Sequence, residues 1–300
     1  MTSVVTILNA PGQASFSDAD AKAVHDALKA AGAHPATPAW LDPGVALDVP
    51  LGRLDPAAAA AVVWNALSGA RIDVVVQPVA DRRKRLLVAD MDSTIIGQEC
   101  LDELATRIGF GERVAALTER AMRGEIDFAA ALTERVALFR AQPVALLERT
   151  FAEAVTLNRG ARTLTATMHK HGAHCALVSG GFTFFTSRVA KAAGFDSFIG
   201  NEFDIRDGKL TGRIQGPIAG ADAKRERLTQ LLTELGIARE QTMGLGDGAN
   251  DIPMLQAAGL GVAYHAKPKV RAAVAARIDY GDLTAALFIQ GYRRDEFVES

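Results

Sequence analysis

The segment that most constrains the fold is a run of four apolar residues, Leu86–Ala89, that ends directly in two aspartates, Asp90 and Asp92. An apolar run of this length is typical of a buried strand. Two carboxylates crowded at its end repel each other and lose hydration, so a cation or a shared proton must compensate. A fold does not need this arrangement, whereas chemistry on an anion with a bound metal does. The segment therefore predicts an active site at the end of a strand.

The composition is that of an ordinary globular protein. Lys and Arg number 33 against 35 Asp and Glu, the net charge is -2, and 49% of the 300 residues are hydrophobic. The chain has neither the basic excess of a nucleic-acid-binding surface nor an apolar run long enough for a membrane span. Its N-terminus lacks the features of a signal peptide, and two cysteines, Cys100 and Cys175, cannot form a disulfide framework. We expect a cytoplasmic protein with no nucleic-acid or membrane partner.

The first 80 residues alternate strand and helix patterns in the order βαββαβ. The patterns predict strands at Val4–Leu8, Thr37–Leu41, Val45–Val49 and Ile72–Val76, and helices from Ser17 to Ala31 and from Pro56 to Ser68. Ser17 is a favoured N-cap residue, and Pro56 suits the first helical position. The order is similar to that of ferredoxin-like or ACT-like domains, which often bind amino acids or mediate dimerisation. We therefore expect an α+β, ACT-like domain over residues 1–80.

A charged segment, Asp81–Arg85, follows and is interpreted as a solvated linker. Beyond it, strand and helix patterns alternate, which is typical of a parallel sheet with helices on both faces. Residues 98–159 interrupt this alternation with an almost entirely helical pattern. We expect them to form a helical cap inserted into an α/β, Rossmann-like core of residues 84–97 and 160–300.

Three further segments carry side chains suited to phosphate chemistry. They are Ser179-Gly180-Gly181, Lys224, and Gly246-Asp247-Gly248-Ala249-Asn250-Asp251. Each lies where a predicted strand ends or a helix begins. Since open parallel sheets bind ligands at the carboxyl ends of their strands, we expect these segments to meet Asp90 and Asp92 at one edge of the sheet.

Asp90 is the natural nucleophile of such a site, because an aspartate can attack a phosphoryl group and form an aspartyl phosphate. Mg²⁺ usually takes one or two carboxylates together with waters and substrate oxygens. The carboxylates of Asp90 and Asp247 with the backbone carbonyl of Asp92 fit that set. Asp92 can protonate the leaving alkoxide and then deprotonate water as general acid and base. The residues alone do not distinguish Mg²⁺ from Mn²⁺.

The remaining residues of these segments can bind phosphate or support the site. Ser179 and the backbone amide of Gly180 can donate hydrogen bonds to phosphate oxygens, as Gly-rich turns do. Lys224 lies in the first turn of a predicted helix, where a cation opposes the helix dipole. Neutralising a phosphate and a carboxylate would explain that position. Asn250 and Asp251 can position waters or Lys224.

These four segments, in this order, resemble the haloacid dehalogenase superfamily of phosphohydrolases over about residues 84–290. The strings Asp90-Met91-Asp92-Ser93-Thr94 and Gly246–Asp251 are similar to those of its phosphoserine phosphatase family. That family has a helical cap inserted after the first motif, and its larger bacterial members carry an N-terminal ACT-like domain. The resemblance implies Mg²⁺-dependent hydrolysis of O-phospho-L-serine to L-serine and phosphate through an aspartyl phosphate, the last step of serine biosynthesis.

The resemblance also implies a pocket for the amino-acid part of the substrate. Glu99 would hold the ammonium group, and Arg135 would bind the carboxylate through two parallel hydrogen bonds. Phe128 and Met122 correspond to apolar cap residues that close over the substrate and exclude water.

Two alternatives stay open. One is a phosphatase or phosphotransferase of the same superfamily for a related metabolite, such as phosphothreonine or homoserine phosphate. The other is a serine-sensing protein in which the catalytic part is secondary, and the N-terminal domain is also a candidate homodimer interface. His169, His171 and His174 cluster in the sequence. We expect ordinary helix-end and turn residues there, because only Cys175 is available to complete a zinc site.

Overall fold

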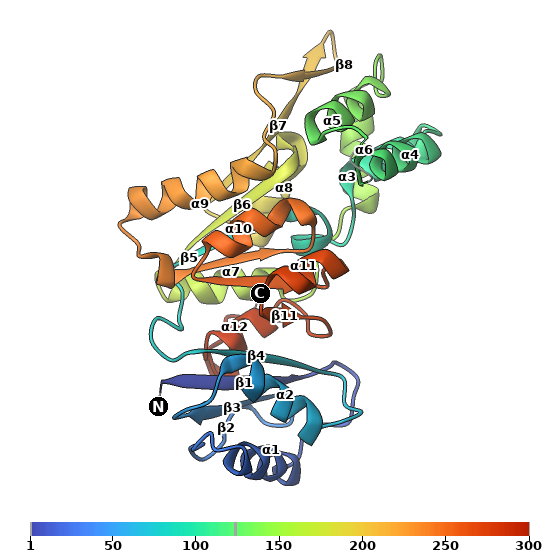
Figure 1. Ribbon diagram of the computed structural model, residues 1–300. Coiled ribbons are helices and arrows are strands. Elements are labelled where there is room, and N and C mark those ends of the chain that lie inside the picture. Colours follow the sequence, from blue (N-terminus) through green and yellow to red (C-terminus); the bar gives the residue numbers. More distant parts are fainter. Residues whose placement is uncertain (1, 123–124, 300) are drawn as a thin grey trace.

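The computed structural model describes residues 2–122 and 125–299 and contains two sheets, one below the other (Figure 1). The smaller sheet is antiparallel, with strand order β2-β3-β1-β4. Its elements are β1 (Ser3–Asn9), α1 (Asp18–Ala30), β2 (Ala39–Asp42), β3 (Ala46–Leu51), α2 (Pro56–Ala66) and β4 (Ile72–Pro78). The expected βαββαβ order is confirmed, with element ends that differ by a few residues.

Local sequence explains where the helices of this domain begin. The Ser17 side chain accepts a hydrogen bond from the amide of Asp20, whose carboxylate accepts one from the Ser17 amide in return. Such a capping box satisfies amides that a helix start leaves unpaired. The Asp55 side chain caps α2 by accepting hydrogen bonds from the amides of Ala57 and Ala58, and Pro56 takes the first helical position. Both helices pack against one face of the sheet through apolar residues such as Val24 and Val63.

The larger sheet of the described residues has seven strands in the order β11-β10-β9-β5-β6-β7-β8. All neighbours are parallel except β8, which pairs antiparallel with β7. The strands are β5 (Leu86–Ala89), β6 (His174–Phe182), β7 (Ser197–Arg206), β8 (Lys209–Gln215), β9 (Thr242–Gly246), β10 (Leu260–Tyr264) and β11 (Ala276–Ile278). The helices are α7 (Ala161–Lys170), α8 (Thr183–Ala193), α9 (Ala221–Leu235), α10 (Ile252–Ala257), α11 (Pro268–Ala273) and α12 (Ala285–Ile289).

Helices cover both faces of this sheet, and β5 lies at its centre. Successive side chains of a strand point to opposite faces. Accordingly, Leu87 belongs to the apolar cluster that contains α7 and α8, whereas Leu86 and Val88 belong to the cluster that contains α9, α10 and α11. Burial on both faces is why the segment is apolar without alternation. The predicted α/β core is confirmed.

The cap lies above the carboxyl edge of the core sheet and consists of α3 (Cys100–Arg107), α4 (Gly111–Met122), α5 (Phe128–Ala137) and α6 (Ala145–Ala154) (Figure 1). Its two connections to the core run side by side. Ile96 and Leu157 form an antiparallel bridge, and the Gln98 side chain exchanges two hydrogen bonds with Thr156.

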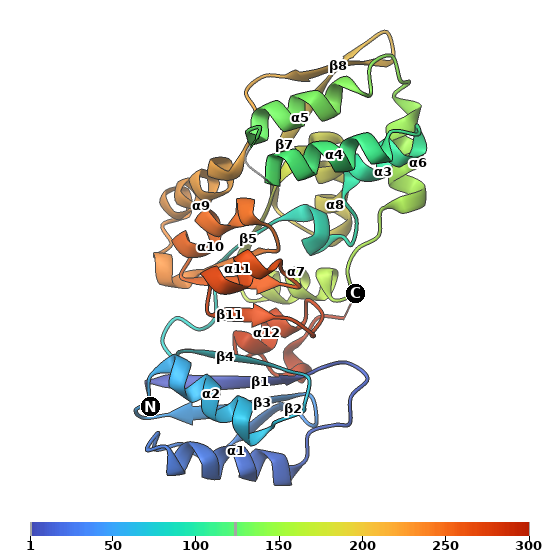
Figure 2. The ribbon, with the colours of Figure 1, turned by 45° about the vertical axis from the view of Figure 1, so that its right-hand side comes forward.

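A β-hairpin that the sequence assigned to the core also joins the cap. Strand β7 starts at Ser197, pairs with β6 and continues into the hairpin, whose second strand, β8, contacts α5 (Figure 2). The amides of Ala141 and Val144 donate hydrogen bonds to carbonyls at Leu210 and Gly208 of the hairpin. The cap is therefore held by the hairpin as well as by its two connections.

The prediction of a solvated linker at Asp81–Arg85 holds for Asp81, Arg83 and Arg85, which are exposed, and is wrong for Arg82 and Lys84. Arg82 donates hydrogen bonds to the carboxylate of Asp48, at 2.6 and 2.8 Å, and to the backbone carbonyl of Ile289. Lys84 is 6% exposed, and its ammonium donates to two backbone carbonyls. Cationic side chains can be buried when their donors are paired in this way. The segment thus fastens the small sheet to the core.

A second contact between the two sheets comes from β4. Asp73 is 2% exposed, and its carboxylate accepts hydrogen bonds from the amides of Asp279, Tyr280 and Gly281. The two domains also share one apolar cluster, to which Val75 and Phe288 belong. Within the described residues, no helix is both long and apolar enough to cross a membrane.

Candidate active site

The carboxyl edge of the core sheet brings the predicted residues together. Strand β5 lies between β9 and β6, with Leu86 level with Thr242 on one side and His174 on the other. Because these strands are parallel, Asp90 after β5, Asp247 after β9 and Ser179 near the end of β6 emerge at the same edge.

Asp90 and Lys224 form the centre of the site. The Asp90 carboxylate accepts a hydrogen bond from the Met91 amide at 2.7 Å through one oxygen and lies 2.7 Å from Lys224 Nζ through the other. Lys224 is 1% exposed and also lies 2.5 Å from Asp251 Oδ1. The second oxygen of Asp251 accepts hydrogen bonds from the amides of Asp247 and Gly248. Both carboxylate oxygens of Asp251 are therefore engaged, one by Lys224 and the other by the amides of this turn.

Negative charge exceeds positive charge in the site. Burial alone would lower the pKa of Lys224, but the carboxylates of Asp251 and Asp90 outweigh it and raise that pKa, so the ammonium stays charged. Burial, with the neighbouring Asp251, raises the pKa of Asp90, and the same two causes raise the pKa of Asp247 to about 6. Lys267 is 4.0 Å from Asp247 and mostly exposed. These acids need a further cation close to them.

The donor set fits a hard divalent cation. Oxygens of Asp90, Asp247 and Asp251 lie within 4.8 Å of one another, and no nitrogen or sulfur ligand belongs to this group of described residues. Since Asp251 is occupied by Lys224 and two amides, Asp90 and Asp247 are the carboxylates available to a metal. Oxygen ligands with few carboxylates are what Mg²⁺ prefers.

Asp92 lies beside this group, in a turn whose shape depends on the neighbouring residue Ser93. Ser93 has a left-handed backbone (φ 53°), and its hydroxyl donates to Glu99 at 2.8 Å. One oxygen of Asp92 accepts from the Cys100 amide at 2.9 Å, and the other accepts from the Ser179 hydroxyl at 3.3 Å. Burial, and then the Glu99 carboxylate, raise the pKa of Asp92 to about 6. A carboxyl of that pKa can both donate and accept a proton near neutral pH.

The raised pKa of Asp92 predicts a pH dependence of stability. The folded state holds the Asp92 proton up to about pH 6, whereas the unfolded state releases it near the ordinary value of 3.8. The folded state therefore binds more protons between these values, and the free energy of unfolding falls as pH rises through them. Asp92→Asn removes this loss. In metal-free protein, the free energy of unfolding of the variant should exceed that of wild type by an amount that grows to about 3 kcal/mol between about pH 4 and pH 7.

Denaturant unfolding in EDTA at several pH values measures this difference. Asp295→Asn, a substitution at a side chain that is 75% exposed, is the matched control and should follow wild type. A stability difference between Asp92→Asn and wild type that stays constant with pH would contradict the assigned pKa.

The Ser179-Gly180-Gly181 segment lies inside β6 rather than at its end. The register between β6 and β7 shifts between Val178 and Phe182, so the strand bulges at these residues. The Ser179 hydroxyl accepts a hydrogen bond from the Gly181 amide at 2.8 Å. Bulges often re-aim backbone next to active sites. The bulge therefore places the predicted phosphate-binding residues beside Asp92.

Phe128 brings the cap into contact with this bulge. A Cβ atom added to Gly180 would lie 3.0 Å from Cζ of Phe128, and one on Gly220 would lie 3.5 Å from the same ring. A Cβ atom at Gly180 would crowd the Phe128 ring, whereas one at Gly220 would make an ordinary van der Waals contact with it. Met122 is the last residue of α4, and its side chain lies outside the described part of the structure.

The other predicted pocket residues lie around this contact. Glu99 is exposed and close enough to raise the pKa of both Asp92 and Asp247. Arg135 faces Asp102 on α3, and its buried Nε has no hydrogen-bond partner among the described residues. Asn250 packs against Gly248 and fills the space that a side chain there would need.

Several supporting residues were not predicted. The Thr94 hydroxyl donates to Asp247 at 3.1 Å, and the Asn158 amide donates to the Thr94 carbonyl at 2.8 Å. Asn201 is 2% exposed and donates to the Gly180 carbonyl while accepting from the amide of Ala219, just before α9. They carry no motif of their own, and only the fold brings them to the site.

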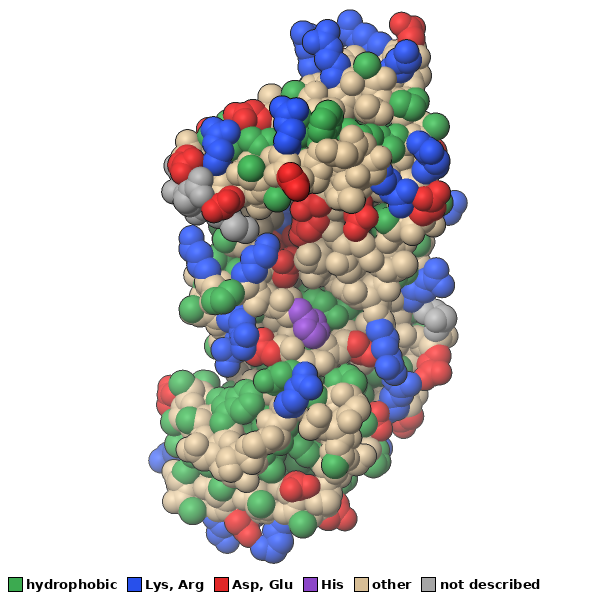
Figure 3. Space-filling model, turned by 90° about the vertical axis from the view of Figure 1, so that its right-hand side faces the viewer, with side chains coloured by type: hydrophobic (Ala, Val, Ile, Leu, Met, Phe, Trp, Pro, Cys, Tyr) green, Lys and Arg blue, Asp and Glu red, His purple; other side chains and the backbone are tan. Residues whose placement is uncertain are grey.

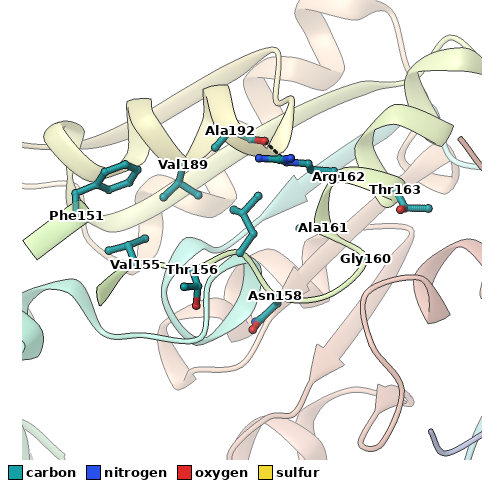
Figure 4. Close-up of a pocket in the computed structure, with 11 residues that line it drawn as sticks. Phe151, Val155, Thr156, Asn158, Gly160, Ala161, Arg162, Thr163, Val189 and Ala192 are labelled. Atoms are coloured by element: carbon teal, nitrogen blue, oxygen red, sulfur yellow. Dashed lines mark hydrogen bonds between the residues drawn. The ribbon is translucent and has the colours of Figure 1, made fainter. Parts of the chain in front are cut away.

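The surface agrees with this placement. Figure 3 shows acidic side chains gathered in the hollow between the cap and the core. A separate cavity of about 450 Å³ lies beside the segment that returns from the cap, between Phe151, Val189 and Arg162 (Figure 4). None of the predicted site residues lines it. The predicted site residues lie instead at the edge of the sheet under the cap.

Comparisons with known proteins agree with this fold and site. Residues 87–256 match the model of the haloacid dehalogenase-like hydrolases. A HAD family hydrolase from Salmonella enterica superposes with a TM-score of 0.83 and 30% identity, covering 96% of this chain and 98% of that one. The chain belongs to the haloacid dehalogenase-like hydrolases.

Relatives within that family are phosphoserine phosphatases. The one from Streptococcus thermophilus is 44% identical over 200 residues, 67% of this chain and 93% of that protein. The one from Archaeoglobus fulgidus is 43% identical over 221 residues, which are 73% of this chain and 64% of the relative's length. A probable phosphoserine phosphatase from Vibrio cholerae superposes with a TM-score of 0.76 and 30% identity, covering 98% of this chain and 88% of that one.

Proposed function

We propose that this chain is a Mg²⁺-dependent phosphatase that hydrolyses O-phospho-L-serine to L-serine and phosphate, in the cytoplasm, as the last step of serine biosynthesis. The observation that carries the proposal is the buried Asp90 carboxylate, 2.7 Å from Lys224, with Asp247 and Asp92 beside it at one sheet edge. The names of the relatives support the substrate.

The residues would divide the reaction as follows. An Asp90 oxygen attacks phosphorus, and the bond from phosphorus to the serine oxygen breaks. Asp92, whose raised pKa of about 6 keeps part of it protonated near neutral pH, gives its proton to the leaving alkoxide in that form. Asp92 then takes a proton from water, whose oxygen attacks phosphorus and releases phosphate and the free Asp90 carboxylate. Lys224, Ser179 and the Gly180 amide would hold the phosphate oxygens.

A metal held by Asp90, Asp247 and the Asp92 carbonyl would supply charge compensation between the nucleophile and the phosphate. Water is excluded by the cap, where Phe128 already contacts the bulge at Gly180. Met122, at the end of α4, belongs to the same proposal.

Selectivity would come from Glu99 for the ammonium group and Arg135 for the carboxylate. The buried, unpartnered Nε of Arg135 supports its role, because a buried donor without a partner is costly unless a ligand pairs with it. Asn250, next to Gly248, would position the attacking water.

A screen of phosphate esters tests the proposal. With Mg²⁺ present, phosphoserine should be turned over faster than phosphothreonine, homoserine phosphate or an ester that lacks the amino-acid part. A preference for homoserine phosphate would favour the alternative of a related metabolite. An absence of turnover on every ester would leave the serine sensor, which binding of serine to the full chain would test. Exchange of Mg²⁺ for Mn²⁺ in the same assay tests the metal.

Arg135→Ala should raise KM for phosphoserine by about 10-fold to 100-fold, because a charge-assisted pair with the carboxylate contributes about 1.5–3 kcal/mol. For an ester without a carboxylate, KM should change little. Steady-state kinetics on both esters measures this split. Arg140→Ala, an exposed arginine of the same cap, is the control and should match wild type. Equal changes on both esters would argue against the assigned pocket.

A further inference from the structure

In the folded chain, the carboxylate of Asp196 lies next to two histidines of the cluster noted in the sequence, His169 and His174. His169 lies in the last turn of α7, Cys175 is the second residue of β6, and Asp196 lies just before β7. The expectation of ordinary polar residues rested on the absence of a carboxylate near Cys175. Asp196 comes from a part of the chain twenty residues further on, so the sequence pattern could not reveal it.

The donor atoms of these three residues converge. A ring nitrogen of His169, Sγ of Cys175 and a carboxylate oxygen of Asp196 lie within 4.8 Å of one another. His169 Nε2 is 2.7 Å from Asp196 Oδ2, which also accepts a hydrogen bond from the Cys175 amide at 2.7 Å. His174 Nδ1 lies 3.7 Å from the same oxygen. From this geometry we propose that His169, Cys175 and Asp196 form a second metal site, which takes a zinc-type transition metal ion.

The chemistry of the ligands selects the metal. A thiolate, an imidazole and a carboxylate are ligands that Zn²⁺ and related ions accept, whereas Mg²⁺ prefers oxygen alone. The site is also distinct in place. His174 pairs in register with Leu86, so the cluster lies at the amino ends of β5 and β6, opposite the edge that carries Asp90. The molecule thus has one oxygen-rich and one mixed-ligand group at opposite edges of the same sheet.

Burial shapes how the ion would bind. Cys175 is fully buried, whereas the side chains of His169 and Asp196 are 31% and 39% exposed. The ion would reach the thiol between the partly exposed side chains of His169 and Asp196, and a water would complete four-fold coordination. Binding replaces the hydrogen bond between His169 and Asp196 and releases the proton of the Cys175 thiol. Affinity therefore rises with pH.

The bound ion would join three elements at the lower edge of the sheet: α7, the start of β6 and the segment before β7. Because it binds the folded chain and finds no such site in the unfolded one, it raises the melting temperature by an amount that grows with the logarithm of its concentration over its Kd. This role is structural and is independent of phosphoserine turnover.

Cobalt(II) titration of the full-length protein, with excess Mg²⁺ filling the oxygen site, tests the proposal. One equivalent should bind with a thiolate-to-cobalt charge-transfer band and the intense visible bands of four-fold coordination, and Zn²⁺ should then bleach both. Cobalt held by oxygen ligands at the Asp90 edge gives no thiolate band, so the two sites are distinguished. Cys100→Ser, which removes the other cysteine, should keep the band, and Cys175→Ser should lose it.

A second test uses two variants that keep the buried thiol of Cys175, namely His169→Ala and Asp196→Asn. Each should weaken cobalt binding at least 10-fold and reduce the rise in melting temperature with Zn²⁺, with circular dichroism confirming the fold. Folded wild-type protein that shows no thiolate band at saturating cobalt overturns the proposal. A band that persists in Cys175→Ser or disappears in Cys100→Ser overturns it as well.

Discussion

Asp90→Asn is expected to abolish turnover of phosphoserine while leaving the fold intact. The amide cannot form the aspartyl phosphate, and removal of a nucleophile that acts in concert with its neighbours lowers kcat by about 10⁴-fold or more. Asparagine has nearly the same shape and keeps the oxygen that accepts from the Met91 amide. Because one of several crowded carboxylates is neutralised, we expect stability to change by no more than about 1–2 kcal/mol.

Steady-state assays with Mg²⁺ and denaturant unfolding of the same preparation measure both effects. Asp295→Asn again controls for an aspartate-to-asparagine exchange at the surface. Asp90→Asn should also fail to incorporate phosphate from labelled phosphoserine after a rapid acid quench, while the wild type does so. Retention of wild-type activity by Asp90→Asn would exclude the proposed mechanism.

Lys224→Met should have the largest effect on stability. The side chain is 1% exposed and lies within 2.7 Å of both Asp90 and Asp251. Methionine fills the space but leaves two buried carboxylates without their cation, and breaking a buried ion pair from one side costs about 3–5 kcal/mol. Turnover should also fall sharply, since the phosphate loses its buried positive charge.

A double-mutant cycle separates this pairing from simple loss of volume. Lys224→Met with Asp251→Asn should be more stable than the sum of the single effects predicts, because the second change removes one of the unpaired charges. Lys22→Met, at a lysine that is 75% exposed, is the control and should stay within about 0.5 kcal/mol of wild type. Strictly additive effects would show that Lys224 does not pair with Asp251.

The sequence predicted the residues of the candidate site better than the residues that hold them in position. An apolar run before Asp90 and glycines around Asp247 are local signals, and they predict chemistry because a fold alone has no use for crowded carboxylates. Asn158 and Asn201 carry no such signal, since an asparagine that holds a backbone carbonyl has the same surroundings in the sequence as one on the surface. Their positions follow from the packing of segments 21 to 64 residues apart.

Charge was the least reliable guide to burial. The run at Asp81–Arg85 has the composition of a solvated linker, yet Arg82 and Lys84 lie between the domains with their donors paired to Asp48 and backbone carbonyls. Composition cannot reveal partners that are distant in sequence. The same reason explains why Asp196 was missing from the expected surroundings of Cys175.

The β7–β8 hairpin has a mechanical consequence. Strand β7 is anchored by its pairing with β6, and the turn after it and β8 accept hydrogen bonds from the amides of Val144 and Ala141, so the hairpin links the core to the cap. A cap held only by its two connections, which are bridged at Ile96 and Leu157, would have more freedom to open than one that the hairpin also holds. Under the proposed function, entry of substrate would then require only a small tilt that lifts Phe128 from Gly180.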